Sequence, residues 1–126
     1  MNQKEIEKFI KEVFSLFNQH DIEAVMSCFT DDCVFLTPGG DHIYGNKIEG
    51  KQAVRASFQN VFDTVKDAAW EDTSHVVDGD RVFSEWIYSG TDIDGNRTEV
   101  QGIDVFTIRD GKIAVKQAFR KNRPTF

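Results

Sequence analysis

The strongest constraint on the fold is a change in the spacing of apolar residues near residue 67. Before this point, apolar side chains recur every three or four residues, as on one face of a helix. After it, they alternate with polar side chains, as along a β-strand. Helices followed by a run of strands predict an α+β fold with an antiparallel sheet, rather than alternating βαβ units.

Two helical segments open the chain. Residues 3–18 place their apolar side chains on one face, and Asn2 with Glu5 predicts a capping box at the start. Asp21 is the expected N-cap of a short second helix, which residues 30–32 should end. Both segments are amphipathic and therefore need a surface to cover.

The rest of the chain supplies that surface and one more helix. A short strand is expected over 33–37, a break at 38–40, and a third helix over 51–64 after Gly50. Asp-Gly hairpin signals separate the later strands. The four expected strands are 68–77, 81–91, 97–109 and 112–123.

The alternation along the strands predicts which side chains share a face. The sets that share a face within their own strands are Ser84, Trp86 and Tyr88, then Val100, Gly102, Asp104 and Phe106, then Lys116, Ala118 and Arg120. The opposite sets include Phe83 and Ile87, then Ile103, Val105 and Ile108, then Val115 and Phe119. Both faces are partly apolar, so one should pack against helices and the other against a second copy, which predicts a homodimer through the outer sheet face.

The length of the last three strands predicts a hollow molecule. Long antiparallel strands twist and coil, which gives the sheet a concave face. If the first helix covers only part of that face, space remains at the open end. We therefore expect a single domain over 1–126: a cone of three N-terminal helices on a strongly curved antiparallel sheet, with an internal pocket for a small apolar ligand.

Composition narrows the class of partner and the compartment. The net charge of −6 argues against a nucleic-acid partner. Residues 1–20 lack the apolar block of a signal peptide, and no run is long enough to span a membrane. Cys28 and Cys33 lack a CxxC arrangement and are expected as reduced thiols, which favours the cytoplasm. The three histidines form no metal motif, and no cofactor is expected.

Several blocks of the sequence are similar to a known superfamily. They are HDIEAVMSCFTDDCVF, GKQAVRASF, GDRVFSEWIYSGT and GIDVFTIRDGKIAVKQAF. In this order they resemble the nuclear transport factor 2-like superfamily and its SnoaL-like branch, which also contains the ketosteroid isomerases. The resemblance covers nearly the whole chain and implies a cystatin-like, ketosteroid-isomerase-like roll. It says little about chemistry, because this fold hosts isomerases, cyclases, dehydratases, hydrolases and binding modules.

Of the three catalytic positions of the ketosteroid isomerases, only one carries the same residue type in this chain. The catalytic Tyr position falls on Val13 and the general-base Asp position on Thr37. The third position, an Asp in the I-D-x-F block, is kept as Asp104. Steroid isomerisation by that machinery is therefore not expected, and Lys116 stands where the isomerases have an apolar residue.

Asp104 is the residue on which the functional hypothesis depends. A mid-strand carboxylate among apolar neighbours is seldom buried unless paired. It is either a salt-bridge partner of Lys116 or Arg120, or an acid or base that faces a ligand. Burial would keep it protonated, whereas a nearby cation would keep it ionised. Because Lys116 can supply that cation, we expect an ionised Asp104.

The remaining candidates surround the expected pocket. His42, in the irregular stretch 41–49, is either an exposed loop residue or a proton donor at the pocket mouth. Trp86 and Tyr88 are either core or pocket wall, with an N–H and an O–H that could orient a ligand. The predicted catalytic residues are Asp104, Lys116 and His42, and the predicted ligand-binding residues are Phe14, Phe17, Phe35, Trp86, Tyr88, Phe106, Ala118 and Arg120.

Two functions remain open from the sequence. One is a cofactor-independent isomerase, cyclase or dehydratase that acts on a small apolar carbonyl compound by acid–base chemistry at Asp104. The other is a non-catalytic dimeric module that binds a ligand or serves as an accessory subunit. The exposure of Asp104 to a pocket of a few hundred cubic ångströms would favour the enzyme, whereas a space filled by Lys116 or Phe106 that leaves Asp104 inaccessible would favour the module.

Overall fold

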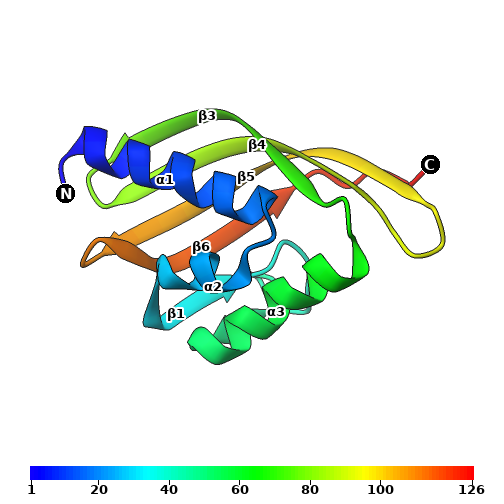
Figure 1. The fold of residues 1–126 in the computed structure, drawn as a ribbon, viewed down its shortest axis with the longest axis horizontal. Coiled ribbons are helices and arrows are strands. Elements are labelled where there is room, and N and C mark those ends of the chain that lie inside the picture. Colours follow the sequence, from blue (N-terminus) through cyan, green and yellow to red (C-terminus); the bar gives the residue numbers. More distant parts are fainter.

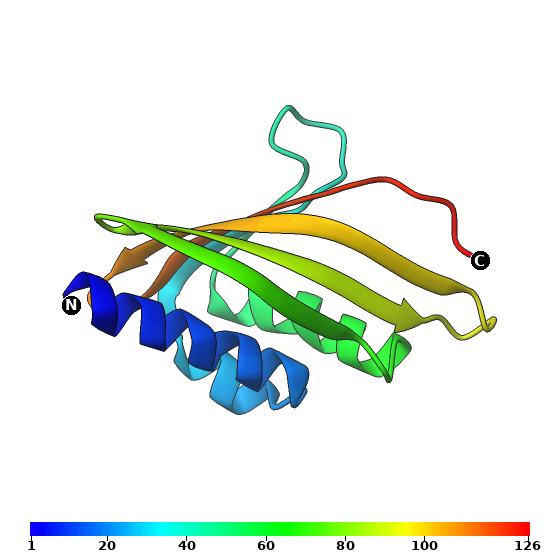
Figure 2. The same cartoon turned by 90° about the horizontal axis from the view of Figure 1, so that it is seen from above.

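The computed structural model describes all 126 residues and has three helices and six strands (Figure 1). The helices lie on one face of a single curled sheet, which leaves the opposite face without a helical cover (Figure 2). None of the helices combines the length and the apolar composition that crossing a membrane requires. In chain order the elements are α1 (Gln3–Asn18), α2 (Ile22–Ser27), β1 (Phe29–Leu36), β2 (Lys47–Glu49), α3 (Lys51–Thr64), β3 (Ala69–Asp78), β4 (Arg81–Thr91), β5 (Arg97–Arg109) and β6 (Lys112–Arg120).

The sequence predicts most of these elements at their observed bounds. The capping box of α1 is present, because the Asn2 side chain accepts from the Glu5 backbone N–H and the Glu5 carboxylate accepts from the Asn2 N–H. The Asp21 side chain caps α2 by accepting from the Ala24 N–H. The bounds of α1, α3, β4 and β5 are confirmed, because local spacing and turn signals fix them.

Other parts of the predicted order are wrong. The third helix is not N-terminal to the sheet, since β1 and β2 precede α3. Residues 30–32 do not merely end α2, because β1 begins at Phe29 and contains them. The short β2 was not predicted, and β6 ends at Arg120 rather than at residue 123. Charged residues are tolerated at 31 and 32 because both side chains face solvent.

The prediction of a wholly antiparallel sheet is also wrong. The strand order is β2-β1-β6-β5-β4-β3, and β1 runs parallel to β6. The other neighbouring pairs are antiparallel. A parallel pair requires a long connection between its strands, and here α3 and the three-strand meander provide it.

The inner face of the sheet packs on α1 and α3 to form one core. The faces predicted for β4 and β6 are confirmed, since Ser84, Trp86 and Tyr88 are buried while Glu85 and Ile87 are exposed. The prediction for Ile108 is wrong, because this side chain follows the alternation of β5 onto the face of Phe106 and lies in the core, while the extra residue of the β5–β6 irregularity, Ala114, is on β6.

Candidate functional site

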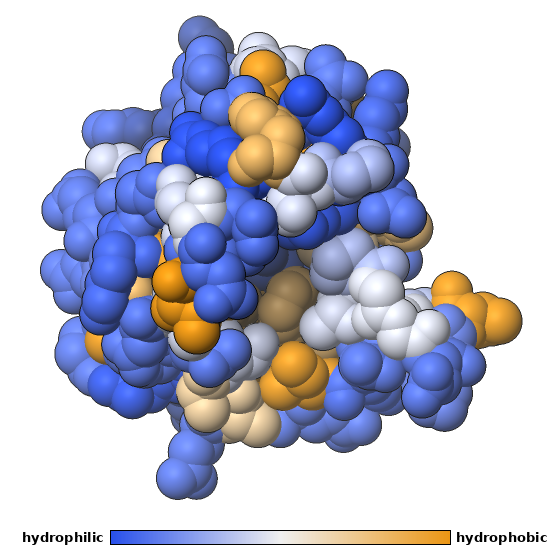
Figure 3. All heavy atoms as spheres, turned by 90° about the vertical axis from the view of Figure 1, so that its right-hand side faces the viewer, coloured by the Kyte–Doolittle hydropathy of each residue, from blue (hydrophilic) through white to orange (hydrophobic).

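The inner face of the sheet carries a hollow of about 290 Å³ that α3 covers. Phe58, Val61 and Phe62 of α3 form one wall, and nine of the fourteen lining residues are hydrophobic. At this end the molecule is visibly hollowed, with an apolar group in the depth of the recess and both apolar and hydrophilic side chains around it (Figure 3). An apolar hollow of this size fits a small organic molecule.

The β6 side chains provide the charge in this hollow. Lys116, Ala118 and Arg120 alternate onto its wall, so two cationic side chains flank a small apolar floor. The Arg120 guanidinium lies 5.4 Å from the ring centre of Tyr88, whose burial raises the pKa of its phenol. Tyr88 therefore remains a neutral O–H group at physiological pH. No acidic side chain is among the lining residues, so the wall is net positive although the whole chain is net negative.

The ammonium of Lys116 sits among aromatic rings. It lies 4.5 Å from the ring centre of Phe35, 5.5 Å from that of Phe58 and 5.6 Å from that of Phe17. These distances are within the range of cation–π attraction. The rings hold the cation at the boundary between the core and the hollow, where its charged partner is Asp104.

Asp104 lies behind Lys116. Its Oδ1 is 3.6 Å from Lys116 Nζ, and the two side chains are 4% and 11% exposed. Burial raises the pKa of the Asp104 carboxyl, and the Lys116 ammonium opposes part of that rise. Burial therefore has a larger effect on the Asp104 pKa than the nearby cation has. The structure does not support the alternative in which Lys116 decides the protonation state of Asp104.

Two polar atoms at this pair lack partners. Asp104 Oδ1 and Trp86 Nε1 are both buried without a hydrogen bond. The indole N–H is near enough to lower the Asp104 pKa, yet it does not reach hydrogen-bond geometry. Gly102, the cross-strand neighbour of Trp86, makes room for the indole, since an added Cβ would lie 2.2 Å from Trp86 Cη2.

The structure divides the predicted site residues into three groups. Phe17, Phe35, Trp86, Tyr88, Lys116, Ala118 and Arg120 line the hollow. Phe14, Phe106 and Asp104 do not, and instead border a void of about 10 Å³ on the core side of Lys116. His42 lies on an exposed loop, stacks on Tyr44 and lines neither space.

Sequence reasoning missed the α3 side of the hollow. The sequence predicted the helix over 51–64 but did not assign Phe58, Val61 and Phe62 to the hollow, because a helical face does not show whether it meets core or cavity. Trp70 on β3 was missed as well, although it borders both spaces. Its ring stacks edge-on against Phe17, which joins α1 to the wall.

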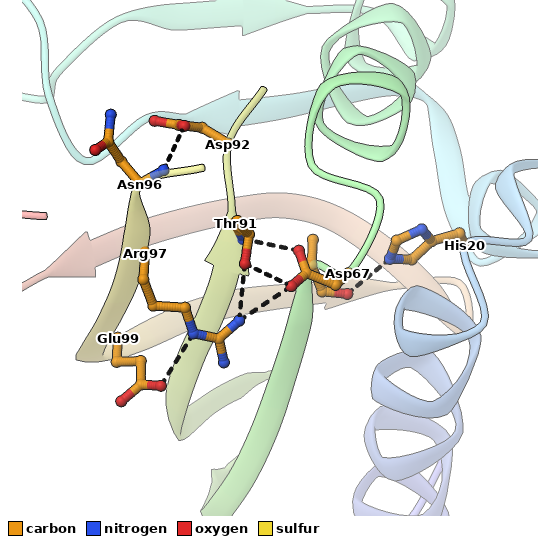
Figure 4. Close-up of polar contacts among 8 residues, drawn as sticks. His20, Asp67, Thr91, Asp92, Asn96, Arg97 and Glu99 are labelled. Carbon is orange, nitrogen blue, oxygen red and sulfur yellow. Dashed lines mark hydrogen bonds and ion pairs between the residues drawn. The ribbon is translucent and has the colours of Figure 1, made fainter. Parts of the chain in front are cut away.

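A polar cluster fixes the connection between α3 and β3 beside the β4–β5 hairpin (Figure 4). The Asp67 carboxylate accepts from the Thr91 backbone N–H at 2.7 Å, from the Thr91 hydroxyl at 2.8 Å and from Arg97 at 3.0 Å. The Thr91 bonds hold the Asp67 pKa below its usual range. His20 Nε2 also lies 2.7 Å from the carbonyl oxygen of Ala68, which follows Asp67 on this connection. These bonds hold the end of α3 in place over the sheet.

The cysteines and the acidic groups suggest no other chemistry. Burial raises the pKa of both the Cys28 and the Cys33 thiol, so neither is a ready nucleophile. No three histidine, cysteine or acidic side chains come together as a metal site. The Lys116–Asp104 pair at the hollow is therefore the best-placed reactive group.

A family model for the SnoaL-like domain matches residues 10–116. The chain belongs to the SnoaL-like domain family. The match spans every element from α1 to β6, including the strands that carry Asp104 and Lys116. No curated protein matches the chain.

Solved structures agree with the SnoaL-like fold. A candidate polyketide cyclase from Xanthomonas campestris pv. campestris superposes with a TM-score of 0.82 at 20% identity, covering 97% of this chain and 93% of its own. An NTF2-like protein of unknown function from Burkholderia pseudomallei gives 0.83 at 16% identity, covering 96% and 92%. TerC, co-crystallised with polyporic acid, gives 0.78 at 21% identity, covering 93% and 91%. At these identities the likeness shows the fold alone.

Proposed function

We propose that this SnoaL-like domain binds a small apolar carbonyl compound in the hollow under α3 and moves a proton on it through the Lys116–Asp104 pair. Such a step is that of a cofactor-independent isomerase, cyclase or dehydratase. The observation that carries the proposal is a largely buried ammonium, held among aromatic rings and paired with Asp104, on the wall of an apolar hollow.

The chemistry follows from where each group lies. Once Lys116 has given a proton to Asp104, its neutral amine can take the proton from the carbon beside a ligand carbonyl. The ammonium so formed stabilises the negative charge on the carbonyl oxygen and can return the proton to another carbon. Asp104 does not touch this ligand and acts through Lys116, by exchanging a proton with it over 3.6 Å. TerC, which shares the fold, was co-crystallised with the small molecule polyporic acid, and this supports a ligand role for the hollow.

A second candidate is a carrier that binds the same compound without turnover. The observation in its favour is that Lys116 separates Asp104 from the hollow, so no carboxylate is in reach of a bound carbon acid. The two candidates share the ligand and differ only in proton transfer. One experiment can therefore separate them.

The experiment uses 2-tetralone and its hydrocarbon counterpart tetralin as probes. Calorimetry measures binding of each, and NMR in D₂O follows deuterium incorporation beside the ketone carbonyl. We expect tighter binding of the ketone and protein-dependent exchange at that carbon. Lys116→Met should abolish both the preference and the exchange, whereas Lys112→Met, an exposed lysine on the same strand, should change neither.

The outcomes divide cleanly. Tighter binding of the ketone without deuterium exchange would support the carrier and contradict the enzyme. Equal binding of ketone and hydrocarbon, or no binding of either, would contradict the proposal that Lys116 binds the ligand carbonyl. Arg120→Gln, at the mouth of the hollow, should weaken an acidic ligand such as 2-naphthoate more than the neutral ketone.

We also propose that two copies associate through the outer sheet face. Ile87 and Phe119 are exposed there, beside a second hollow of about 430 Å³ that no helix covers. Light scattering after gel filtration should give twice the monomer mass. Phe119→Asp should halve that mass, and a monomeric parent protein at micromolar concentration would contradict the dimer.

A further inference from the structure

A row of polar side chains crosses the inner face of the sheet at the level of Asp104. His75 on β3 pairs with Ser84 on β4, and Ser84 pairs in turn with Asp104 on β5. His75 Nδ1 lies 2.7 Å from Ser84 Oγ, and His75 Nε2 lies 2.6 Å from Asp72 Oδ2. Asp72, His75 and Ser84 thus form a hydrogen-bonded chain outside the Lys116–Asp104 site.

An irregularity in β3 makes this chain possible. The register shifts between Asp72 and Ser74, so Asp72 pairs with Trp86 and His75 with Ser84, both inner-face residues. Without the shift, two residues three apart on a strand would face opposite sides of the sheet. The extra residue at Thr73 therefore brings a carboxylate and an imidazole to the same face.

The chain runs from solvent to the core. The Asp72 side chain is 32% exposed, that of His75 is 5% exposed, and Ser84 is fully buried. Phe14 of α1 packs edge-on against the His75 ring, with the ring centres 5.3 Å apart, and shields it from water. A buried serine hydroxyl and imidazole at the centre of a core cost stability unless their hydrogen bonds are satisfied, as they are here.

Chemistry sets the direction of the hydrogen bonds. An ionised Asp72 can only accept, so His75 Nε2 donates to it, and the neutral imidazole then accepts at Nδ1 from the Ser84 hydroxyl. The Ser84 hydroxyl oxygen then has acceptor capacity left, and its other cross-strand neighbour is Asp104. Asp104 Oδ1 is itself without a partner, and directly paired side chains on one face have Cβ atoms roughly 5 Å apart.

We propose that Asp72, His75 and Ser84 form the path by which the buried Asp104 carboxyl exchanges its proton with solvent. The inference rests on the proposed role of Asp104 as the proton partner of Lys116, because a buried acid that works repeatedly must be reset. The step between Asp104 and Ser84 is not hydrogen bonded in the structure, so the path requires the Asp104 carboxyl to rotate towards Ser84.

The transfer moves one proton from Asp104 to water, and each bond that breaks along the path is matched by one that forms. The Asp104 O–H bond breaks as its proton passes to Ser84 Oγ, while the Ser84 hydroxyl proton passes to His75 Nδ1. The His75 Nε2 proton passes to the Asp72 carboxylate, from which water removes it. Rotation of the serine hydroxyl and return of the imidazole to its first tautomer restore the path.

Apart from Lys116, the elements packed on Asp104 offer one group that can relay its proton, the Ser84 hydroxyl. From β6 it meets Lys116, and from β4 it meets Ser84 and the indole N–H of Trp86. The α1 residues at the adjoining void are apolar: Val13, Phe14 and Phe17. A proton that does not leave through the lysine and the hollow therefore leaves along the row.

The test follows the Asp104 proton directly and needs no ligand. Infrared spectroscopy identifies the carboxylic acid C=O band that is lost in Asp104→Asn, at a pH at which the band is present. Stopped-flow mixing with D₂O then gives the rate at which the band shifts. Ser84→Ala should slow this rate by about tenfold or more.

Asp72→Asn separates proton transfer from structure. The asparagine carbonyl still accepts from His75 Nε2, but it cannot take the proton, so exchange should slow while the melting temperature changes little. Glu85→Gln, beside Ser84 but on the outer face, is the matched control and should exchange at the parent rate.

A parent exchange rate in either Ser84→Ala or Asp72→Asn overturns the path. So does the absence of any band that Asp104→Asn removes, over the pH range in which the protein is folded. Failure of ketone binding would leave these results unaffected, so the two proposals fail separately.

Discussion

Replacing Lys116 by methionine leaves the Asp104 carboxyl buried without its counter-charge. At the observed 3.6 Å, and with an effective dielectric constant of about 20, the pair attraction is roughly 4–5 kcal/mol. Methionine recovers part of this by packing against Phe17, Phe35 and Phe58, and the lysine no longer has to be desolvated. We therefore expect the free energy of unfolding to fall by about 2–4 kcal/mol where Asp104 is ionised.

The loss should depend on pH in a defined direction. Burial raises the Asp104 pKa in the folded state, so the folded chain holds this proton to a higher pH than the unfolded chain does. The contribution of Asp104 to stability is therefore greatest below its unfolded pKa, falls as the pH rises to the folded pKa, and is constant above it. Without the ammonium, which lowers this pKa, the fall continues to higher pH.

Urea unfolding of the parent protein and Lys116→Met between pH 5 and 8 tests the reasoning. The difference between their free energies of unfolding should be smallest at the acidic end and grow towards the alkaline end. Lys112→Met, an exposed lysine on β6, should show no such trend. A deficit that is the same at every pH would mean that the lost contacts, and not the charge beside Asp104, determine the stability.

Two further substitutions probe the walls of the hollow. Gly102→Ala places a Cβ 2.2 Å from Trp86 and 2.6 Å from the Phe119 carbonyl oxygen, so it should lower the free energy of unfolding by about 1–3 kcal/mol and shift the tryptophan fluorescence. Unchanged fluorescence would show that the indole does not depend on this glycine. Phe58→Ala should cost about 3–5 kcal/mol by chemical denaturation, because the ring is buried and packs on three others. Phe119→Ala, on the outer face, should cost much less, and equal losses for both would contradict the assigned faces.

Much of the site could be predicted because it lies on regular strands. Alternation along β4 and β6 is a local property, and it placed Trp86 with Tyr88, and Lys116 with Arg120, on one face of their own strands before any contact was known. It could not place Asp104 behind Lys116, because that depends on how far each side chain reaches into space that α1 and α3 share.

The sequence by itself determined the helices of residues 3–18 and 51–64, the long hairpins and the superfamily resemblance, because spacing, caps and turns act over a few residues. Only the tertiary structure decided the parallel pairing of β1 with β6 and the meeting of Asp72, His75 and Ser84. In a regular strand, residues 72 and 75 lie on opposite faces, so the spacing predicted no partner for His75. One extra residue in the β3–β4 pairing reverses that relation, and pairing between strands is fixed by packing rather than by local sequence.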